Sequence, residues 1–297
     1  MTQYHHEEKR PVSASAVARI IIWSVVLCVL VGLFAQSMMG EGLFSVSFGG
    51  YTYDDTGFAV GNGSTRETIH GISVDWLAGD VTVTAADGDE IVITEDYDGG
   101  REELRLRWKV EDGELVVKYV KPYRFRLKGM EPKNLTVAIP AAMLENMADV
   151  EIMAVDGNIT YNGNADELSL EAVDGEIAVN GDIGELDIEG VNMQIIFRGA
   201  VRKADVECVD ATVDMYLDMA TELSFDLVDG DVAVYLSEEI TGFSVELDAL
   251  SKGVDAAGFD GLQELSRGNT RWGDGRLRIL VDGVDADVKI RKLTEKD

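Results

Sequence analysis

Cysteine and histidine are scarce in this sequence, which has two cysteines and three histidines among its 297 residues. Cys28 falls inside a long apolar run and Cys208 lies far beyond it, so we expect neither a disulfide framework nor a cysteine-rich metal site. The short motifs of serine hydrolases, phosphate-binding loops and zinc proteases are also missing. These shortages argue against an enzyme, because they remove the usual catalytic constellations.

Basic residues are few relative to acidic ones. The chain has 26 lysines and arginines against 55 aspartates and glutamates, a formal net charge of −29. A charge of this sign repels a phosphate backbone, so we expect no nucleic acid as a partner. The apolar content of 46% is high enough for a folded core and argues against a disordered chain.

Helical periodicity is missing from most of the chain. From residue 69 nearly to the end, apolar and polar residues alternate in short runs separated by turn residues, which is typical of β-strands. Only residues 140–150 are compatible with a helical turn or two. We predict an all-β domain over residues 69–292, preceded by a glycine-rich linker at residues 40–68.

One long hydrophobic run is present, the uncharged stretch Ile20–Met39 (IIIWSVVLCVLVGLFAQSMM). A helix of this length spans roughly 30 Å, the hydrocarbon thickness of a bilayer, so we predict a transmembrane helix. A cleaved signal peptide is the alternative, but no small-x-small cleavage site follows the run. Lys9, Arg10 and Arg19 precede it and no basic residue follows closely, which predicts a cytoplasmic tail at residues 1–19 and an extracytoplasmic domain.

The strand alternation contains an internal repeat marked by Val-Asp-Gly. With the aspartate of this triplet as position 0, the copies are 18, 18, 18 and 19 residues apart and have at this position Asp156, Asp174, Asn192, Asp210 and Asp229. Positions −4, +3 and +5 are apolar in all of these copies. Flanking copies place Ala78 and Asp285 at position 0, and a degenerate copy surrounds Ala249, before an insertion at residues 251–276.

A single repeat, two short strands joined by a corner, cannot bury its apolar row alone. Stacked repeats can, because each covers the face of the next and pairs its backbone groups. The 18-residue step fits one coil of a β-solenoid or one hairpin of a repetitive sheet stack. We predict the solenoid-like stack of two-strand repeats, with an antiparallel hairpin as an insertion.

The repeated aspartates Asp156, Asp174, Asp210 and Asp229 have two interpretations. Asp and Gly tolerate the left-handed backbone of tight corners, and the carboxylate can accept a hydrogen bond from a nearby backbone N–H. Alternatively, the stacked carboxylates form a Ca²⁺ site, since two charges about 4.8 Å apart repel by about 0.9 kcal/mol even in water. Asn192 interrupts the row and no spacing matches a known calcium loop, so turn chemistry is favoured and no cofactor is expected.

Residues 101–133 reverse the charge pattern, with ten basic and six acidic residues. Alternating runs around an Asp-Gly turn predict a hairpin with one basic face, to which we assign Arg105, Arg107, Lys109, Arg124, Arg126 and Lys128. A solvent face that neutralises some of the acidic repeats is one interpretation. The other is a binding patch for an anionic envelope polymer, lipid headgroups or a surface protein.

Three stretches resemble a known family: ISVDWLAGDVTVTAADGDEIVITE (72–95), NLTVAIPAAM (134–143) and the repeated VDGxIxV units. They are similar to the putative-adhesin, β-strand-repeat domain family of bacterial surface proteins, over roughly residues 68–292. Where that family commonly has Ser-Gly or Thr-Gly at the corner, this chain has Asp-Gly. The resemblance implies a β-solenoid-like fold and an envelope location, and it carries over no catalytic residue.

We therefore predict a single-pass membrane protein whose external domain has a non-catalytic binding, adhesin-like or envelope-structural role. An envelope-sensing subunit that acts through a membrane partner is the first alternative, since the cytoplasmic tail is too short for a signalling domain. The second is a solenoid-type polysaccharide-active enzyme, for which residues 266–276 offer arginines, an aspartate and Trp272 as a sugar platform.

Overall fold

The computed structural model describes residues 53–122, 132–251, 253–265 and 269–293, which all belong to one compact unit. The predicted cytoplasmic tail and transmembrane helix lie outside the described residues, as do Arg124, Arg126 and Lys128. Within the part of the chain that the structure describes, no helix is long and apolar enough to cross a bilayer.

The described residues are almost entirely strands and turns, which confirms the all-β prediction. The helical elements are one α-turn, α2 (Ala141–Leu144), and one 3₁₀ turn, η1 (Glu102–Leu104). The strands are β1 (Ala59–Val60), β2 (Gly63–Thr65), β3 (Gly71–Trp76), β4 (Val81–Ala86), β5 (Ile91–Glu95), β6 (Arg107–Glu111), β7 (Glu114–Lys118), β8 (Leu135–Pro140), β9 (Met147–Asp156), β10 (Ile159–Asn162), β11 (Ala165–Asn180), β12 (Ile183–Leu236), β13 (Gly242–Ser251), β14 (Val254–Asp255), β15 (Gln263–Glu264), β16 (Thr270–Gly273) and β17 (Leu277–Lys292).

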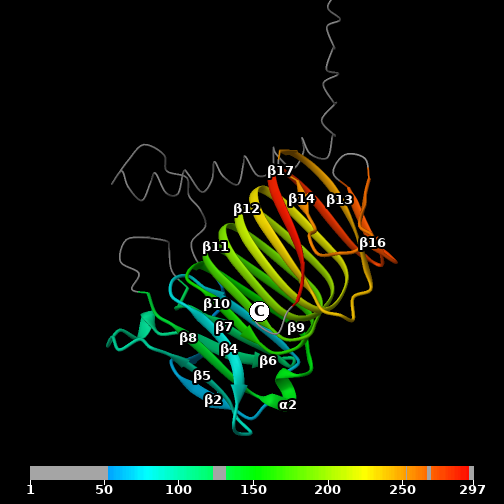
Figure 1. The fold of residues 1–297 in the computed structure, drawn as a ribbon. Helices are drawn as coiled ribbons and strands as arrows, with labels where there is room; N and C mark the ends of the chain where they lie inside the picture. The colour runs from blue at the N-terminus through cyan, green and yellow to red at the C-terminus, as the bar shows by residue number, and fades with distance from the viewer. Residues whose placement is uncertain (1–52, 123–131, 252, 266–268, 294–297) are drawn as a thin grey trace, which may run out of the picture. The chain divides into compact units, whose positions relative to one another are not determined.

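Among the described residues, the strands form one 17-stranded sheet that curls round and is nearly closed (Figure 1). Successive repeats lie side by side in it and run parallel. β10 pairs with β11 from Ile159 opposite Ile177, and β11 pairs with β12 from Ala165 opposite Ile183, so each residue faces the one 18 positions later. In the first repeat the two strands, β9 and β10, pair with neighbouring repeats and not with each other as a hairpin would.

Apolar side chains at positions −4, +3 and +5 form the core of the repeats, as predicted. In the five copies from Asp156 to Asp229, each of these side chains is at most 1% exposed. Side chains alternate between the two faces of a strand, so positions −3 and +4 face outward. Burying a large apolar side chain such as Phe197 or Phe225 contributes about 1.5–3 kcal/mol, and each repeat covers the apolar row of the next.

The sheet continues beyond the first repeat toward the N-terminus. β3 and β4 pair in parallel with β9 and β10, with Trp76 opposite Ala154 and Val81 opposite Ile159, which confirms Ala78 at position 0. β7 and β8 extend this unit in parallel, and β6 and β5 then pair with them antiparallel. The short strands β1 and β2 pair with β6 and β5, so the sheet begins inside the segment that the sequence assigned to the linker.

The predicted hairpin is present. β6 and β7 pair antiparallel, and the turn between them has Asp112 and Gly113 in left-handed conformations, with φ of 53° and 81°. Asp-Gly suits such a turn because two successive positive φ values match the twist of the paired strands. We call strands β1–β8 the N-terminal end.

The order of strands at the C-terminal side differs from their order in the chain. β17 pairs with the last repeat of β12 on one side, with Asp285 opposite Asp229, which confirms the flanking copy at Asp285. On its other side β17 pairs with β13, so β13 lies beyond the C-terminal strand. Ser251 of β13 faces Asp285, which moves position 0 of the degenerate copy from Ala249 to Ser251. Sequence spacing shows that a copy exists but not where it is inserted.

Candidate functional site

The aspartates at position 0 lie at the corner between the two strands of each repeat. Asp156, Asp174, Asp210 and Asp229 are all exposed. Asn192 joins the row that it interrupts in the sequence, because its Nδ2 donates a hydrogen bond to Asp174 Oδ1 at 3.0 Å. Within the described residues, the one group of three acids close enough to share a metal ion lies elsewhere.

Left-handed glycine occurs at only some of the corners. Gly157 and Gly175, at position +1, have φ of 142° and 145°. A Cβ on Gly175 would lie 2.4 Å from the carbonyl oxygen of Gly157, so this corner requires glycine. Met193 occupies the same position in the next repeat without a positive φ. Glycine at position +1 is therefore a local requirement of the first corners and not of the repeat as a whole.

Side chains at position +2 cap the backbone of the corners. Asp80 Oδ1 accepts a hydrogen bond from the backbone N–H of Asn158 at 3.0 Å, and Asn158 Oδ1 accepts one from the N–H of Glu176 at 2.8 Å. Each cap links one repeat to the next. The turn chemistry expected of position 0 is thus performed two residues later, by Asp80 and Asn158.

An acidic face covers the outer side of the strand that precedes each corner. Positions −4 and −2 point inward, so positions −5 and −3 point outward. Position −3 is acidic in seven of eight paired segments, with Met153 as the exception: Asp75, Glu171, Glu189, Glu207, Asp226, Asp282 and Asp248. Position −5 adds Glu151, Asp187, Asp205 and Glu246. No lysine or arginine occupies either position, and we call these eleven residues the acidic face.

Burial and the close packing of like charges raise the pKa values of two carboxyl groups on the acidic face. Glu171 lies directly opposite Glu189 in the neighbouring repeat. Burial, followed by the charges of Glu189 and Glu151, raises the pKa of Glu171 above its usual value. Burial and the Asp205 carboxylate likewise raise the pKa of Asp187. Both groups therefore gain from a bound proton or a nearby cation.

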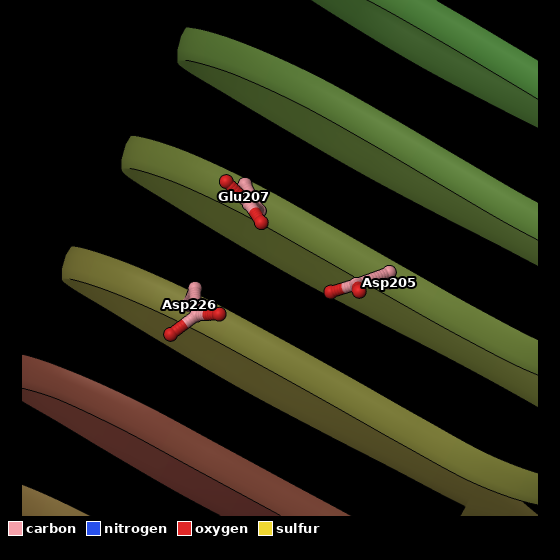
Figure 2. Close-up of side chains that lie close together, drawn as sticks. All are labelled: Asp205, Glu207 and Asp226. Carbon is pink, nitrogen blue, oxygen red and sulfur yellow. The ribbon is translucent and has the colours of Figure 1, made fainter. Parts of the chain in front are cut away.

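Three residues of the acidic face come especially close together. Asp205 and Glu207 lie on one strand segment and Asp226 on its neighbour, with one carboxylate oxygen of each within 4.8 Å of the others (Figure 2). Oδ1 of Asp205 is buried and has no hydrogen-bond partner among the described residues. Oxygen-only ligands suit hard cations such as Ca²⁺. The sequence carried this signal, because acids recur at position −3 with the same step as the corner aspartates.

The outer side of the strand after each corner has a different chemistry. At position +6, the guanidinium of Arg198 lies 4.2 Å from the ring centre of Tyr216. The rings of Tyr216 and Tyr235 stack with centroids 4.6 Å apart and planes 4° apart. Tyr235 in turn lies opposite Arg291. Acidic ladders are thus a property of one face of the repeats and not of every exposed position.

The predicted basic face is only partly exposed. Arg107 is 4% exposed, and its guanidinium donates to the backbone carbonyls of Glu102, Arg105 and Leu106, so its assignment to a surface patch is wrong. Lys109 pairs with Glu111 and lies 4.9 Å from the Phe58 ring centre. The Arg107 guanidinium turns back onto the carbonyls of the chain just before it, and the Phe58 ring lies against Lys109, so neither side chain is open to solvent as the alternation alone suggests. Of the six residues assigned to the patch, Arg105 is the described one that is neither buried nor paired with an acid.

Comparison with known proteins gives distant structural relatives. No protein family model matches the chain, and no curated protein matches it. Similar solved structures include a putative adhesin from Bacteroides fragilis NCTC 9343, with a TM-score of 0.42 and 8% identity over 78% of this chain and 97% of that chain. Others are a putative adhesin from Parabacteroides merdae ATCC 43184 (TM-score 0.36, 13% identity, 80% and 96% covered) and a putative cell adhesion protein from Clostridium sporogenes ATCC 15579 (0.28, 10%, 79% and 100%). These names agree with the family resemblance in the sequence, and at these TM-scores they assign no ligand or residue role to this chain.

A buried ion pair in the N-terminal end has no signal in the sequence. The side chains of Lys133 and Glu95 are 2% and 0% exposed and form an ion pair. The ammonium also donates to the carbonyl oxygens of Leu104 and Tyr119, and Glu95 accepts from the N–H of Leu106. Burial lowers the pKa of Lys133 to about 8, against the opposing effect of Glu95. Both charged groups of the pair thus have hydrogen-bond partners, as buried charges need. This indicates a role in holding the fold together.

Aromatic rings surround this ion pair. The Lys133 ammonium lies 4.4 Å from the ring centre of Tyr119 and 5.1 Å from that of Trp76. Trp76 donates its indole N–H to the carbonyl oxygen of Lys133 at 2.8 Å. The ring faces stabilise the buried cation and exclude water from it.

Trp272, considered as a sugar platform, lies in a packed aromatic cluster. Its ring is 4.9 Å from Phe259 and 5.9 Å from Phe243, and its indole N–H donates to the carbonyl oxygen of Asp260 at 3.0 Å. Phe243 belongs to β13, beyond which no further repeat is stacked among the described residues. The cluster therefore covers the end of the apolar core.

Proposed function

We propose that this chain is a membrane-anchored, extracytoplasmic β-solenoid with a non-catalytic, adhesin-like binding role. Support for the solenoid comes from the parallel pairing of successive repeats at an offset of 18 residues. With this offset, outward-facing side chains at the same repeat position lie next to each other and form a row. Support for the anchor and the location comes from the uncharged run Ile20–Met39 and the basic residues before it.

The binding surface in this proposal is the acidic face. The observation that carries it is the acid at position −3 in seven of eight paired segments. Rows of like charge about 4.8 Å apart repel each other, and a positively charged macromolecule relieves this repulsion along the whole row. We therefore assign the partner to a polycation, such as a basic protein surface, held with an affinity that falls as salt rises.

The test uses the purified full-length chain in detergent, with poly-L-lysine as the probe. Neutralising three acids of the face should raise the dissociation constant about tenfold or more at low salt; the substitutions are Glu151→Gln, Glu171→Gln and Glu189→Gln. The matched control removes three exposed acids elsewhere, and these are Glu238→Gln, Glu239→Gln and Asp260→Asn. Equal losses in the two variants would mean attraction to the net charge alone and would remove the acidic face from the proposal.

Location is tested separately, in cells that express the full chain. An anchored external domain should resist carbonate extraction of the membranes and should be cut by protease added to intact cells. Release by carbonate, or protection of the domain from external protease, would overturn the anchor and the location while leaving the binding result unaffected.

A further inference from the structure

A groove follows the second corner of the repeats, away from the Val-Asp-Gly corner. It has a volume of about 540 Å³ and is lined by residues 164–166, 182–184 and 200–202 of three successive repeats, and by 145–147 after α2. Its floor consists of the buried apolar residues at position +9. Because parallel strands lie about 4.8 Å apart, equivalent groups recur along the groove at that spacing.

The wall of the groove carries planar polar groups. Asn164 Oδ1 accepts a hydrogen bond from the N–H of Asp182 at 2.9 Å, and Asp182 Oδ1 accepts one from the N–H of Ala200 at 3.0 Å. The amide Nδ2 of Asn164 and the second oxygen of Asp182 bond to no other described residue. These groups are fixed in place by their first hydrogen bond and retain the capacity for another.

The charge in the groove is predominantly negative. Glu145, Asp166 and Asp182 line it, and the one basic residue in its lining, Arg202, pairs with Glu185 at 2.6 Å. An acidic lining repels phosphate and carboxylate polymers and accepts hydroxyl and amino groups. Met219, which is 65% exposed, adds an apolar surface at one end.

We propose that this groove binds an extended glycan strand that carries hydroxyl and amino groups, with about one sugar unit per repeat. The rise of the repeats is close to the length of one pyranose in an extended glycan, so each unit meets an equivalent set of groups. Carboxylate and amide oxygens bind the hydroxyl and amino groups, and the apolar floor packs against ring C–H groups. An extended peptide binds by adding to a strand edge, and the corners offer no such edge.

The inference rests on the proposed extracytoplasmic role for its access to envelope glycans, but its site is separate from the acidic face. The purified full chain is titrated calorimetrically with a β-linked glucosamine hexamer, with the N-acetylated hexamer and with a galacturonate hexamer. The glucosamine hexamer should bind most tightly and the galacturonate hexamer should not bind. An Asp166→Ala, Met219→Ala variant should weaken the glucosamine complex about tenfold or more.

The matched control carries Asp156→Ala at the Val-Asp-Gly corner and Met153→Ala on the strand before it, which remove the same side-chain types from exposed positions outside the groove. Its affinity for the glucosamine hexamer should equal that of the unchanged chain. Absence of saturable binding, tightest binding of galacturonate, or equal losses in the two variants would each overturn the proposal. Failure of the unchanged chain to bind poly-L-lysine, with glycan binding retained, would reject the proposed function instead.

Discussion

The N-terminal end and the repeats are parts of one sheet, yet the first buries charged side chains and the second keeps them on the surface. The buried charged residues among the described ones are Glu95, Arg107 and Lys133, and all three belong to the N-terminal end. In β9 to β12 the buried residues are apolar and the acids lie outside. The repeats thus have an interior that any similar layer can extend.

The difference identifies what ends the stack. An apolar layer with free backbone groups on its edge accepts another strand, so a stack of identical repeats has no intrinsic limit. The N-terminal end breaks the pattern with antiparallel strands and with a matched ion pair that a plain repeat cannot continue. We interpret Lys133 and Glu95 as a device that specifies this boundary, in the sense that buried polar groups can fix one arrangement at some expense in stability.

The largest expected effect is therefore at the ion pair. Lys133→Ala leaves the Glu95 carboxylate buried without its partner and should lower the free energy of unfolding by about 3–5 kcal/mol. Urea denaturation measures the loss. Hydrogen exchange should place it in β5–β8, with protection in β11 and β12 largely retained.

Two controls decide whether the charge itself is responsible. Lys121→Ala removes an exposed lysine of the same end and should change stability by less than about 0.5 kcal/mol. Replacing both Lys133 and Glu95 by methionine should recover only part of the loss, because it removes the unpaired charge but leaves the carbonyls of Leu104 and Tyr119 and the N–H of Leu106 without these partners. If the double variant is as unstable as Lys133→Ala, then packing and the hydrogen bonds to the backbone, and not the unpaired charge, account for the loss.

A smaller effect is expected at a corner of the repeats. Gly175→Ala places a Cβ 2.4 Å from a backbone carbonyl and at a φ of 145°, so it should cost about 1–3 kcal/mol. Ala211→Gly, at the same position in a repeat without positive φ, should cost only about 0.5–1 kcal/mol. Thermal unfolding compares the two. Equal costs would mean that the corners share one backbone geometry despite their different residues.

These contrasts show which features were readable from the sequence. The apolar positions, the 18-residue step, the Asp112–Gly113 hairpin and the flanking copies at Ala78 and Asp285 were predicted, because each depends on local alternation and spacing. The position of β17 between β12 and β13 was not predicted. The order in which strands pair depends on tertiary packing, and several strand edges in this chain have similar sequences. Spacing alone cannot rank those edges.

The candidate sites were harder to predict for two reasons. Burial of Arg107 comes with hydrogen bonds to the carbonyls of Glu102 and Arg105, which strand alternation does not reveal. The Lys133–Glu95 pair joins residues 38 positions apart with no repeating signal. The acidic face was readable, because acids recur at position −3 with the repeat step. The Val-Asp-Gly triplet is the more conspicuous repeat in the sequence, but it marks the corner between the two strands and not the acidic face.

Calcium should stabilise the repeats and not the N-terminal end. The Asp205, Glu207 and Asp226 group should bind Ca²⁺ in preference to Mg²⁺, which at about ten times the dissociation constant adds about 1.4 kcal/mol to the free energy of unfolding. Melting of the full chain in EDTA and in calcium measures this. Asp205→Asn should abolish the shift and Asp210→Asn, at an exposed corner, should preserve it. The reverse result would return the cation site to the corner aspartates.

The smallest expected effect is the pH response of the acidic face. A carboxyl group whose pKa is raised by folding binds its proton more readily in the folded state, so its contribution to stability grows as pH falls toward that raised pKa. Glu171 and Asp187 both have raised pKa values. Hydrogen exchange in β11 should therefore slow between pH 7 and pH 5, after correction for the intrinsic exchange rate.

Glu171→Gln should stabilise the repeats at pH 7 by a few tenths of a kcal/mol, the amount expected when one of two facing like charges is removed. It should also flatten the pH dependence, whereas Glu238→Gln, which removes an exposed acid outside the face, should do neither. An unchanged or steeper pH dependence in the Glu171→Gln chain would mean that Glu171 does not set the response, and its repulsion with Glu189 would then have no measurable effect on stability.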